Sequence, residues 1–311
     1  MEDRPEGFDE RLLARALESW GIGATSLTYA PVGFGDYHWE ARGPDGGHWF
    51  VTVSDAGRKG VAGLRAAMDA AAALAERLDF VVAPLRAAGG ATVVPAGDRY
   101  AVSVFPFVDG TAGRFGEELT ASDRAAVIDL LAGLHAAEPP APVAVRPLEL
   151  SGRGALEEAL RDTGPWRGGP YAEPARDLLL GRAAALLARL AEFDRGAGRV
   201  AARPVVTHGE PHPGNLLRAR GRFLLVDWDT VGLAPPERDL WLVAEGPGDL
   251  ARYAEAAGRA PDPALLELYR LRWQLDDVAE YAAWFRGPHG RTPDTEVAWA
   301  SLEGTVGHLT S

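Results

Sequence analysis

VVTHGEPHPGNLLRARGRFLLVDWDTVGLAPPERD, residues 205–239, is the segment of this chain that says most about its fold. Two short apolar runs, PVV at 204–206 and FLLV at 223–226, flank a polar loop; such junctions place side chains at the edge of a core, where sites commonly form. A single polar residue there is most simply explained as a partner for buried backbone groups. Six in one stretch instead indicate a site: His208, Glu210, His212, Asn215, Asp227 and Asp229.

Three of these residues form a set suited to metal-assisted chemistry. Asn215 and Asp227 supply oxygen atoms, which are the ligands that Mg²⁺ prefers. Glu210 lies five residues before Asn215 and could accept a proton from a hydroxyl group while Asn215 holds the metal ion. We therefore predict that Glu210, Asn215 and Asp227 are catalytic, with the last two as metal ligands.

The first hundred residues outside this stretch have the pattern of an antiparallel sheet. Strands are predicted at 26–31, 37–42, 49–54, 91–95 and 100–105, with helices at 8–19 and 63–78. Asp45-Gly46 between the second and third strands is a hairpin signal. The fold class predicted from these elements is α+β.

Beyond residue 110 the pattern becomes mainly helical. Helices are predicted at 119–137, with Thr120 as N-cap, at 175–195, at 263–286 and at 294–308. We place the boundary between two lobes at 106–110. This gives an N-terminal lobe of residues 1–106, small and built on the sheet, and a larger C-terminal lobe of residues 107–311.

Composition excludes several classes of protein. The 311 residues are 47% hydrophobic and 24% charged, as in an ordinary globular protein, and the absence of cysteine excludes disulfides and thiolate metal sites. A formal net charge of -12 argues against a nucleic-acid partner, and no apolar run is long enough for a membrane partner. The start of the chain has no apolar signal segment, so we expect a cytoplasmic protein. The oligomeric state is not set by any pattern in the sequence.

Two segments resemble a known family. HGEPHPGN at 208–215 is similar to the catalytic-loop signature of the aminoglycoside phosphotransferase-like kinases, and LLVDWD at 224–229 is similar to their metal-binding segment. Weaker matches follow in the same order along the chain: GFGDYHW at 33–39, SVFPF at 103–107, LLAGLH at 130–135 and YRLRWQLDDVAEYAAWFRGPH at 269–289. The resemblance implies a bilobal, protein-kinase-like fold over nearly the whole chain.

The same resemblance implies a reaction and its cofactors. The chain would be an ATP- or GTP-dependent phosphotransferase acting on a hydroxyl group of a small polar molecule, such as an aminoglycoside or other aminated natural product. Mg²⁺ held by Asn215 and Asp227 would bridge the nucleotide phosphates, and Glu210 would orient or deprotonate the acceptor hydroxyl.

Nucleotide-binding residues are implied in the N-terminal lobe. Backbone groups of Phe105 and Phe107 would contact adenine. Gly33 and Gly35 would let the backbone approach the phosphates, although a glycine turn between strands is the commoner explanation of such a pair. Thr52 occupies the strand position from which the family's lysine anchors the phosphates.

Two departures from the family pattern leave a second interpretation open. Glu210 stands where the family has aspartate, and its side chain is one methylene longer. Thr52 stands where the family has lysine, and the one lysine of the chain, Lys59, lies seven residues later. The alternative is a kinase-fold protein without phosphotransfer activity, which binds a ligand or uses the site for other chemistry.

Acidic residues are candidates for contact with a cationic substrate. The family uses carboxylates of the C-terminal helices in this way, and Asp276, Asp277 and Glu280 lie on one such predicted helix. A solvated helix face explains these three equally well. We assign Asp229, two residues after Asp227, to the same substrate-binding group.

Overall fold

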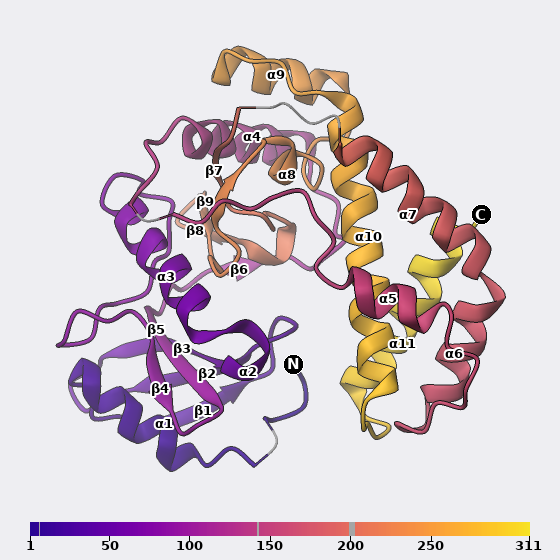
Figure 1. The fold of residues 1–311 in the computed structure, drawn as a ribbon. Helices are drawn as coiled ribbons and strands as arrows, with labels where there is room; N and C mark the ends of the chain where they lie inside the picture. Colours follow the sequence, from indigo (N-terminus) through magenta and orange to yellow (C-terminus); the bar gives the residue numbers. More distant parts are fainter. Residues whose placement is uncertain (6, 142, 199–202) are drawn as a thin grey trace. The chain divides into compact units, whose positions relative to one another are not determined.

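The computed structural model describes residues 1–5, 7–141, 143–198 and 203–311 of the chain. The chain divides into two units (Figure 1). Unit 1 combines Met1–Arg146 with Arg203–Pro261, and unit 2 combines Pro147–Ala202 with Asp262–Ser311. The lobe boundary expected at 106–110 lies inside unit 1 and stays a prediction.

Unit 1 begins with a five-stranded antiparallel sheet, in agreement with the sequence. Its order is β1-β2-β3-β5-β4. The strands are β1 Ser26–Ala30, β2 Tyr37–Arg42, β3 His48–Asp55, β4 Val94–Ala96 and β5 Tyr100–Pro106. The hairpin predicted at Asp45-Gly46 joins β2 to β3. Strand β3 is central, so Thr52 lies between His38 of β2 and Ser103 of β5.

The two faces of this sheet differ because side chains alternate along each strand. One face is apolar and buries Trp39, Val51 and Val53 against Leu13 and Leu17 of helix α1, Glu10–Leu17. The other face carries the polar residues of the same strands, including Thr52. Helices α2, Ala56–Lys59, and α3, Val61–Ala75, follow β3.

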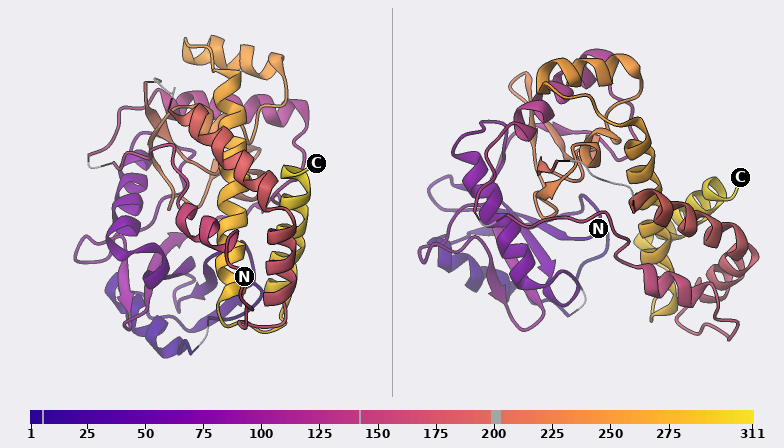
Figure 2. Two further views of the ribbon diagram at one scale, coloured as in Figure 1. Left: turned by 45° about the vertical axis from the view of Figure 1, so that its right-hand side comes forward. Right: turned by 45° about the horizontal axis from the view of Figure 1, so that its top comes forward.

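The remainder of unit 1 supports the stretch from 205 to 239. Its helices are α4 Ala121–His135, α8 Glu237–Leu240 and α9 Pro247–Ala257, and its strands are β6 Thr111–Ala112, β7 Val205–Thr207, β8 Leu216–Ala219, β9 Arg222–Leu225 and β10 Gly232–Ala234. Helix α4 begins at the predicted N-cap Thr120 and packs along α9 (Figures 1 and 2). The β8–β9 hairpin turns at Arg220 and Gly221, both with positive φ.

Unit 2 is helical, with α10, Pro263–Arg286, at its centre. Around α10 pack α5 Arg153–Ala159, α6 Ala172–Gly181, α7 Ala183–Ala197 and α11 Pro293–Leu309 (Figure 2). The single helix predicted at 175–195 is wrong, because the chain leaves the helical region at Arg182 (φ -118°, ψ 6°) and forms α6 and α7 instead. Within the described ranges, no helix is long and apolar enough to cross a membrane.

Candidate active site

The first loop of the site, residues 208–215, connects β7 to β8 and presents Glu210 and Asn215. The Asn215 carboxamide Nδ2 donates a hydrogen bond to the Glu210 carbonyl oxygen at 2.9 Å. Because a carbonyl can only accept, this contact fixes the orientation of the amide and leaves Oδ1 for a metal ion. The Asn215 side chain is buried, whereas Glu210 is half-buried.

The second loop, residues 226–231, follows β9 and presents Asp227. The Val226 N–H donates to the Asn215 carbonyl oxygen at 3.1 Å, one step beyond the Leu216–Leu225 pair of the hairpin. This backbone contact places Asn215 beside the residue preceding Asp227. Asp227 has a φ of +63°, a left-handed conformation that aspartate tolerates better than most residues. The backbone of Asp227, whose side chain is exposed, is thereby held close to Asn215.

His208 connects the two loops. Its Nε2 lies 2.9 Å from the Val226 carbonyl oxygen, and its Nδ1 accepts from the Glu210 N–H at 3.2 Å. The two partners assign one tautomer, since Nε2 must donate to a carbonyl and Nδ1 must accept from an amide. Complete burial lowers the pKa of His208 by desolvation, against the opposing effect of the nearby Asp239. A neutral imidazole therefore joins the backbones that carry Glu210 and Asp227.

His212 also acts as a neutral acceptor. Its Nδ1 accepts from the Gly214 N–H at 3.1 Å and caps the short 3₁₀ turn Pro213–Asn215. Burial, together with the nearby His208, lowers the pKa of His212 to about 4. The histidine is thus in the state that this hydrogen bond requires at neutral pH.

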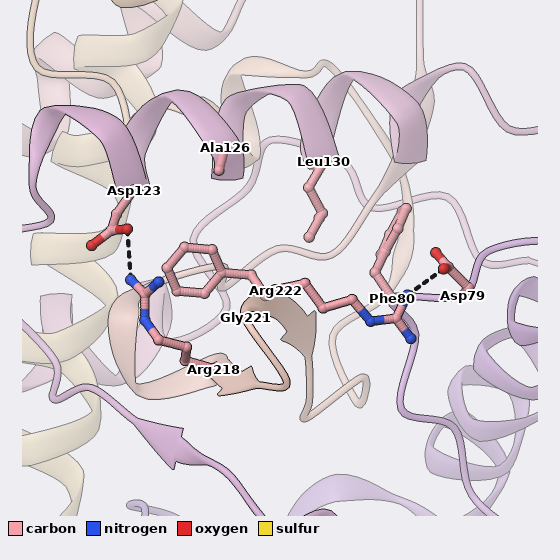
Figure 3. Close-up of a pocket in the computed structure, with 9 residues that line it drawn as sticks. Asp79, Phe80, Asp123, Ala126, Leu130, Arg218, Gly221 and Arg222 are labelled. Atoms are coloured by element: carbon pink, nitrogen blue, oxygen red, sulfur yellow. Dashed lines mark hydrogen bonds and ion pairs between the residues drawn. The ribbon is translucent and has the colours of Figure 1, made fainter.

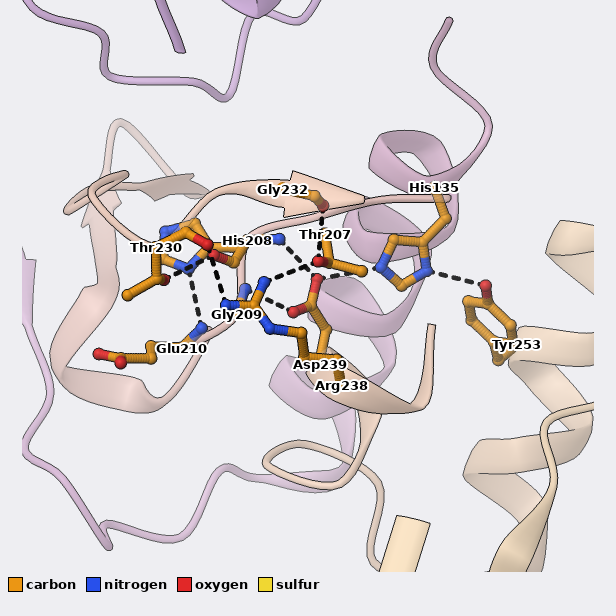
Figure 4. Close-up of polar contacts among 10 residues, drawn as sticks. All are labelled: His135, Thr207, His208, Gly209, Glu210, Thr230, Gly232, Arg238, Asp239 and Tyr253. Atoms are coloured by element: carbon orange, nitrogen blue, oxygen red, sulfur yellow. Dashed lines mark hydrogen bonds and ion pairs between the residues drawn. The ribbon is translucent and has the colours of Figure 1, made fainter. Parts of the chain in front are cut away.

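Asp239, fully buried on α8, lies beneath the first loop (Figure 4). Its carboxylate accepts from the His208 N–H at 2.8 Å and from the Gly209 N–H at 2.6 Å, and it lies 3.0 Å from His135 Nε2. Burial opposes ionisation, yet the hydrogen bond and charge of His135 and the Arg238 cation hold the pKa of Asp239 below its ordinary value. The loop backbone is therefore fixed on a carboxylate.

Arg238 and Tyr253 extend this arrangement in opposite directions. Arg238 donates to the Thr207 hydroxyl at 2.8 Å and to the Thr230 carbonyl at 2.9 Å, which joins β7 to the second loop (Figure 4). Tyr253 lies 2.8 Å from His135 Nδ1. We call this set of residues the loop scaffold: His135, Thr207, His208, Gly209, Thr230, Arg238, Asp239 and Tyr253.

Gly209 of the loop scaffold cannot be replaced without displacement of a neighbour. Its φ is +103°, and a Cβ atom at this position would lie 2.2 Å from Arg238 Nη2. Arg238 is itself buried and held by two hydrogen bonds. The close approach of Gly209 to the guanidinium therefore requires a residue without a side chain.

The predicted nucleotide-binding residues lie on and beside the N-terminal sheet. Gly33 and Gly35 both have positive φ, +68° and +105°. Thr52 Oγ1 lies 3.2 Å from His38 Nδ1. Phe105 is buried on β5, and the Phe107 N–H donates to the His48 carbonyl oxygen at 3.3 Å.

The predicted substrate-binding residues are divided between the units. Asp229 belongs to unit 1, in the second loop. Asp276, on α10 of unit 2, accepts from the Ser151 N–H at 2.9 Å and pairs with Arg272 at 3.2 Å, and burial raises its pKa. Asp277 and Glu280 lie on the same helix, where burial and then their negative charges raise the pKa of Tyr281 to about 12. Their roles toward a substrate stay predictions.

Sequence reasoning did not assign the residues that hold the loops in place. Asp239 and Arg238 close the quoted stretch, and His135 lies in LLAGLH, but none was given a role. The signal that could have found Asp239 is its place at the start of an apolar run after Pro235-Pro236, where a carboxylate is rarely left without partners.

The donor set of the two loops fits magnesium. In the part of the chain that the structure describes, no group of three or more histidine, aspartate or glutamate side chains is arranged to hold a metal ion. Mg²⁺ does not need such a group, because it keeps several water ligands and is commonly held by one or two protein oxygens together with phosphates. The Asn215 Oδ1 atom and the Asp227 carboxylate meet that requirement.

A pocket of about 400 Å³ lies between the β8–β9 hairpin and helix α4, and none of the predicted site residues lines it (Figure 3). Arg218 pairs with Asp123 at 2.6 Å at one side, and Arg222 pairs with Asp79 at the other. The rest of its lining is mostly apolar: Phe80, Ala126, Leu130, Gly221 and Phe223. Both arginines are neutralised by carboxylates, so the pocket offers no unbalanced charge for a phosphate.

Comparisons with known sequences agree with this geometry. The profile of the APH, or phosphotransferase enzyme, family matches residues 26–284. Protein StrN of Streptomyces griseus is 36% identical over 239 residues, which is 72% of this chain and 70% of that protein. The resemblance read from the sequence to aminoglycoside phosphotransferase-like kinases is therefore confirmed.

Solved structures confirm the kinase-like fold. A spectinomycin phosphotransferase, solved with ADP and spectinomycin, superposes with a TM-score of 0.75 at 15% identity and covers 98% of both chains. An amicoumacin kinase, solved with AMP-PNP and Ca²⁺, gives a TM-score of 0.64 at 15% identity over 97% of this chain and 94% of that chain. A microcompartment-associated aminopropanol kinase gives 0.61 at 19% identity over 97% and 96%.

Proposed function

The chain belongs to the phosphotransferase enzyme family, and from this premise we propose that it transfers the γ-phosphoryl group of ATP or GTP to a hydroxyl group of a small polar molecule. The single observation that carries the proposal is the joint placement of Glu210, Asn215 and Asp227. Two loops on either side of the β8–β9 hairpin present a carboxylate and two metal-binding oxygens, and His208 joins their backbones.

Glu210 is the proposed residue that acts on the acceptor. Its carboxylate accepts the proton of the acceptor hydroxyl as that oxygen forms a bond to the γ-phosphorus, while the bond from phosphorus to the bridging oxygen breaks and the nucleoside diphosphate leaves. The Glu210 N–H is fixed on His208 and its carbonyl on Asn215. The N–H and the carbonyl of Glu210, the proposed catalytic base, are thus both held in place, which favours a constant position for its side chain.

Asn215 and Asp227 are the proposed magnesium ligands. They would hold the ion, which would supply positive charge against the negative charge that develops during transfer. Asn215 contributes Oδ1, because its Nδ2 is committed to the Glu210 carbonyl. Asp227 contributes a carboxylate held by a left-handed backbone.

The N-terminal sheet and the loop between β1 and β2, which contains Gly33 and Gly35 and which we call the glycine loop, are the proposed nucleotide side. Gly33 and Gly35 would allow the backbone near the phosphates, and Thr52 lies on the central strand of the sheet. The Phe107 N–H is bonded to the His48 carbonyl oxygen, so a contact of Phe107 with adenine would use its own carbonyl oxygen. Phe105 would contribute backbone groups of β5.

An aminated natural product is the proposed acceptor. Related structures were solved with spectinomycin and amicoumacin, and this chain carries a net charge of -12. Asp229, Asp277 and Glu280 would bind cationic groups of such an acceptor. Asp276 would belong to the same group, and its carboxylate also accepts from the Ser151 N–H and pairs with Arg272.

The direct test is a screen for phosphoryl transfer. The purified chain is incubated with Mg²⁺, ATP or GTP, and a panel of aminoglycosides, other aminated sugars and simple amino alcohols; nucleoside diphosphate release and the phosphorylated product are measured. We expect diphosphate release that depends on one acceptor class. Release without an acceptor product would show only hydrolysis, and no nucleotide binding at all would overturn the proposal.

Variants of Glu210 test the assigned base. Glu210→Gln keeps the shape of the side chain and removes the charge, so kcat should fall by about 10²-fold or more while the affinity for nucleotide stays similar. Glu210→Asp withdraws the carboxylate by about one methylene. A site built around glutamate should lose activity with aspartate, whereas a gain would show that the longer side chain is a relic.

One observation favours the second function, a kinase fold that binds ligand without phosphoryl transfer. Thr52 brings no positive charge to the strand where the family carries lysine, and the side chains of Arg58 and Lys59 lie outside the described part of the structure. Calorimetry distinguishes the two functions. Tight Mg-nucleotide binding, combined with no transfer to any acceptor in the screen, would favour the alternative.

A further inference from the structure

One face of the N-terminal sheet carries a series of polar contacts between β2 and β3. Ser54 donates to Asp36 at 2.8 Å, His38 lies 3.2 Å from Thr52, and His48 lies 3.0 Å from Glu40. The register His38↔Thr52 and alternation along the strands place all six residues on one side, opposite the apolar core. We call this set the polar sheet face.

His38 is the member of this face that lies against the glycine loop. Its Nδ1 contacts Thr52 Oγ1, and its ring stacks on Phe50 with centroids 5.0 Å apart and planes 26° apart. Its Nε2 would be 3.5 Å from a Cβ atom at Gly33. Two contacts thus fix the ring, and its Nε2 edge lies beside the backbone of Gly33.

Three described arginines of the N-terminal part of unit 1 are paired with carboxylates. Arg42 lies 3.7 Å from Glu40, Arg99 lies 2.8 Å from Asp55, and Arg86 of the segment after α3 lies 2.8 Å from Asp69. The Met1 ammonium group donates to the Gly33 carbonyl oxygen at 2.6 Å, and His38 is the sheet side chain that lies beside the same backbone. Thr52 is short, and its hydroxyl is already in contact with His38.

We propose that His38 binds a phosphate group of the nucleotide, in an orientation that Thr52 sets. When the Thr52 hydroxyl donates to Nδ1, the proton of the imidazole is on Nε2, which then donates to a phosphate oxygen. Thr52 is a positioning residue in this arrangement. The inference rests on the proposed function, because it requires the nucleotide phosphates to lie under the glycine loop.

Two substitutions of His38 distinguish the contribution of Nδ1 from that of Nε2. The carboxamide of His38→Asn can replace Nδ1 against Thr52 but cannot reach the place of Nε2, whereas His38→Gln can place its amide near Nε2. Binding of Mg-ATP or Mg-GTP, whichever the wild type binds, and of the matching nucleoside is measured by calorimetry. We expect about a tenfold or greater loss of triphosphate affinity in His38→Asn, a smaller loss in His38→Gln, and unchanged nucleoside affinity.

Thr52→Val tests whether Thr52 positions His38. It also provides an independent test of the proposal if a His38 variant fails to fold. It should weaken triphosphate binding in the wild-type background and have no further effect in His38→Asn, since the two residues act through one contact. The control is His308→Asn, the same change at an exposed histidine of α11. Thermal unfolding without ligand confirms that each variant is folded.

The outcomes distinguish this inference from the function on which it rests. If the wild type binds no nucleotide, both fall. If the wild type binds the triphosphate and both His38→Asn and Thr52→Val bind it equally well, only the role of His38 falls. Equal losses of triphosphate and nucleoside affinity would show a structural role for His38 and would also overturn the inference.

Discussion

The loop scaffold around Asp239 and the polar sheet face around Thr52 both hold ionisable side chains beneath a loop that contains glycine, but their partners differ. Asp239 accepts from two backbone amides and contacts His135, and Arg238 binds two oxygen atoms. On the polar sheet face the contacts are cross-strand pairs between side chains, such as His38 with Thr52. The first arrangement fixes a backbone and the second fixes side chains.

This difference has a functional meaning under the proposed reaction. The loop scaffold holds the residues that would meet the acceptor and the metal ion, whose positions must be constant for catalysis. On the polar sheet face Asp36 and Ser54 are buried, whereas His38 and Thr52 are half-buried and would exchange water for phosphate oxygens. Substitutions in the loop scaffold should therefore affect stability most, and those on the polar sheet face should affect ligand binding most.

The largest effect on stability should follow from Asp239→Ala. Two buried N–H groups and His135 would lose their acceptor, and we expect the free energy of unfolding to fall by about 3–5 kcal/mol. Urea unfolding measures it. The matched change on the polar sheet face, Ser54→Ala, removes one hydrogen bond to Asp36 and should cost about 1–2 kcal/mol. Equal losses would break the comparison.

Next come the glycines of the two regions. Gly209→Ala meets a φ of +103° and a contact of 2.2 Å with Arg238, so we expect a loss of about 2–4 kcal/mol and a marked fall in kcat. Gly33→Ala meets a φ of +68° and an ordinary contact of 3.5 Å with His38. Its cost should be about 1 kcal/mol. Unfolding curves of the two variants, side by side, show whether the loop scaffold is the more rigid region.

A smaller effect concerns pH. The unfolded chain protonates His212 near pH 6.5, whereas the folded chain resists protonation until about pH 4. Stability is therefore complete above pH 6.5 and decreases as the pH falls from 6.5 toward 4, by about 2 kcal/mol at pH 5 from this group. The lowered pKa of His208 acts in the same direction.

The check is urea unfolding at pH 7 and pH 5 without added metal. In His212→Asn the side-chain oxygen can still accept from the Gly214 N–H, but it does not titrate, so the decrease should be about 2 kcal/mol smaller. The exposed His308→Asn should retain the full decrease. If His212→Asn and the wild type respond alike, the pKa of His212 is not depressed by the fold.

The smallest effect on stability should come from Asp227→Asn. Asparagine tolerates the left-handed conformation of φ +63°, so the change in unfolding free energy should stay within about 0.5 kcal/mol. Mg²⁺-dependent nucleotide binding should nevertheless be lost, because the variant lacks the carboxylate. Calorimetry with and without Mg²⁺ measures this. Asp227→Ala, which places alanine at positive φ, is the less clean variant, and unchanged affinity in Asp227→Asn would contradict the ligand role.

Sequence patterns predicted elements well where local signals were complete. The strands before and after Asp45-Gly46 and the N-cap at Thr120 agree with the structure. The break at Arg182 was missed because the apolar positions Ala175, Leu179, Leu186 and Leu190 keep helical spacing across it. Both helices bury these residues in one core, so the spacing of the apolar residues does not reveal that one residue between the helices is non-helical.

The sequence by itself determined the α+β class, the family, and the two loops with Glu210, Asn215 and Asp227, because these depend on local patterns and on motifs of neighbouring residues. Tertiary structure alone decided which groups meet across the chain. Asp239 lies about thirty residues after the backbone amides that it accepts from, and His135 reaches it from more than a hundred residues earlier. Such contacts depend on packing between α4, α8 and the loop, and on the need of every buried polar group for a partner, which no local pattern encodes.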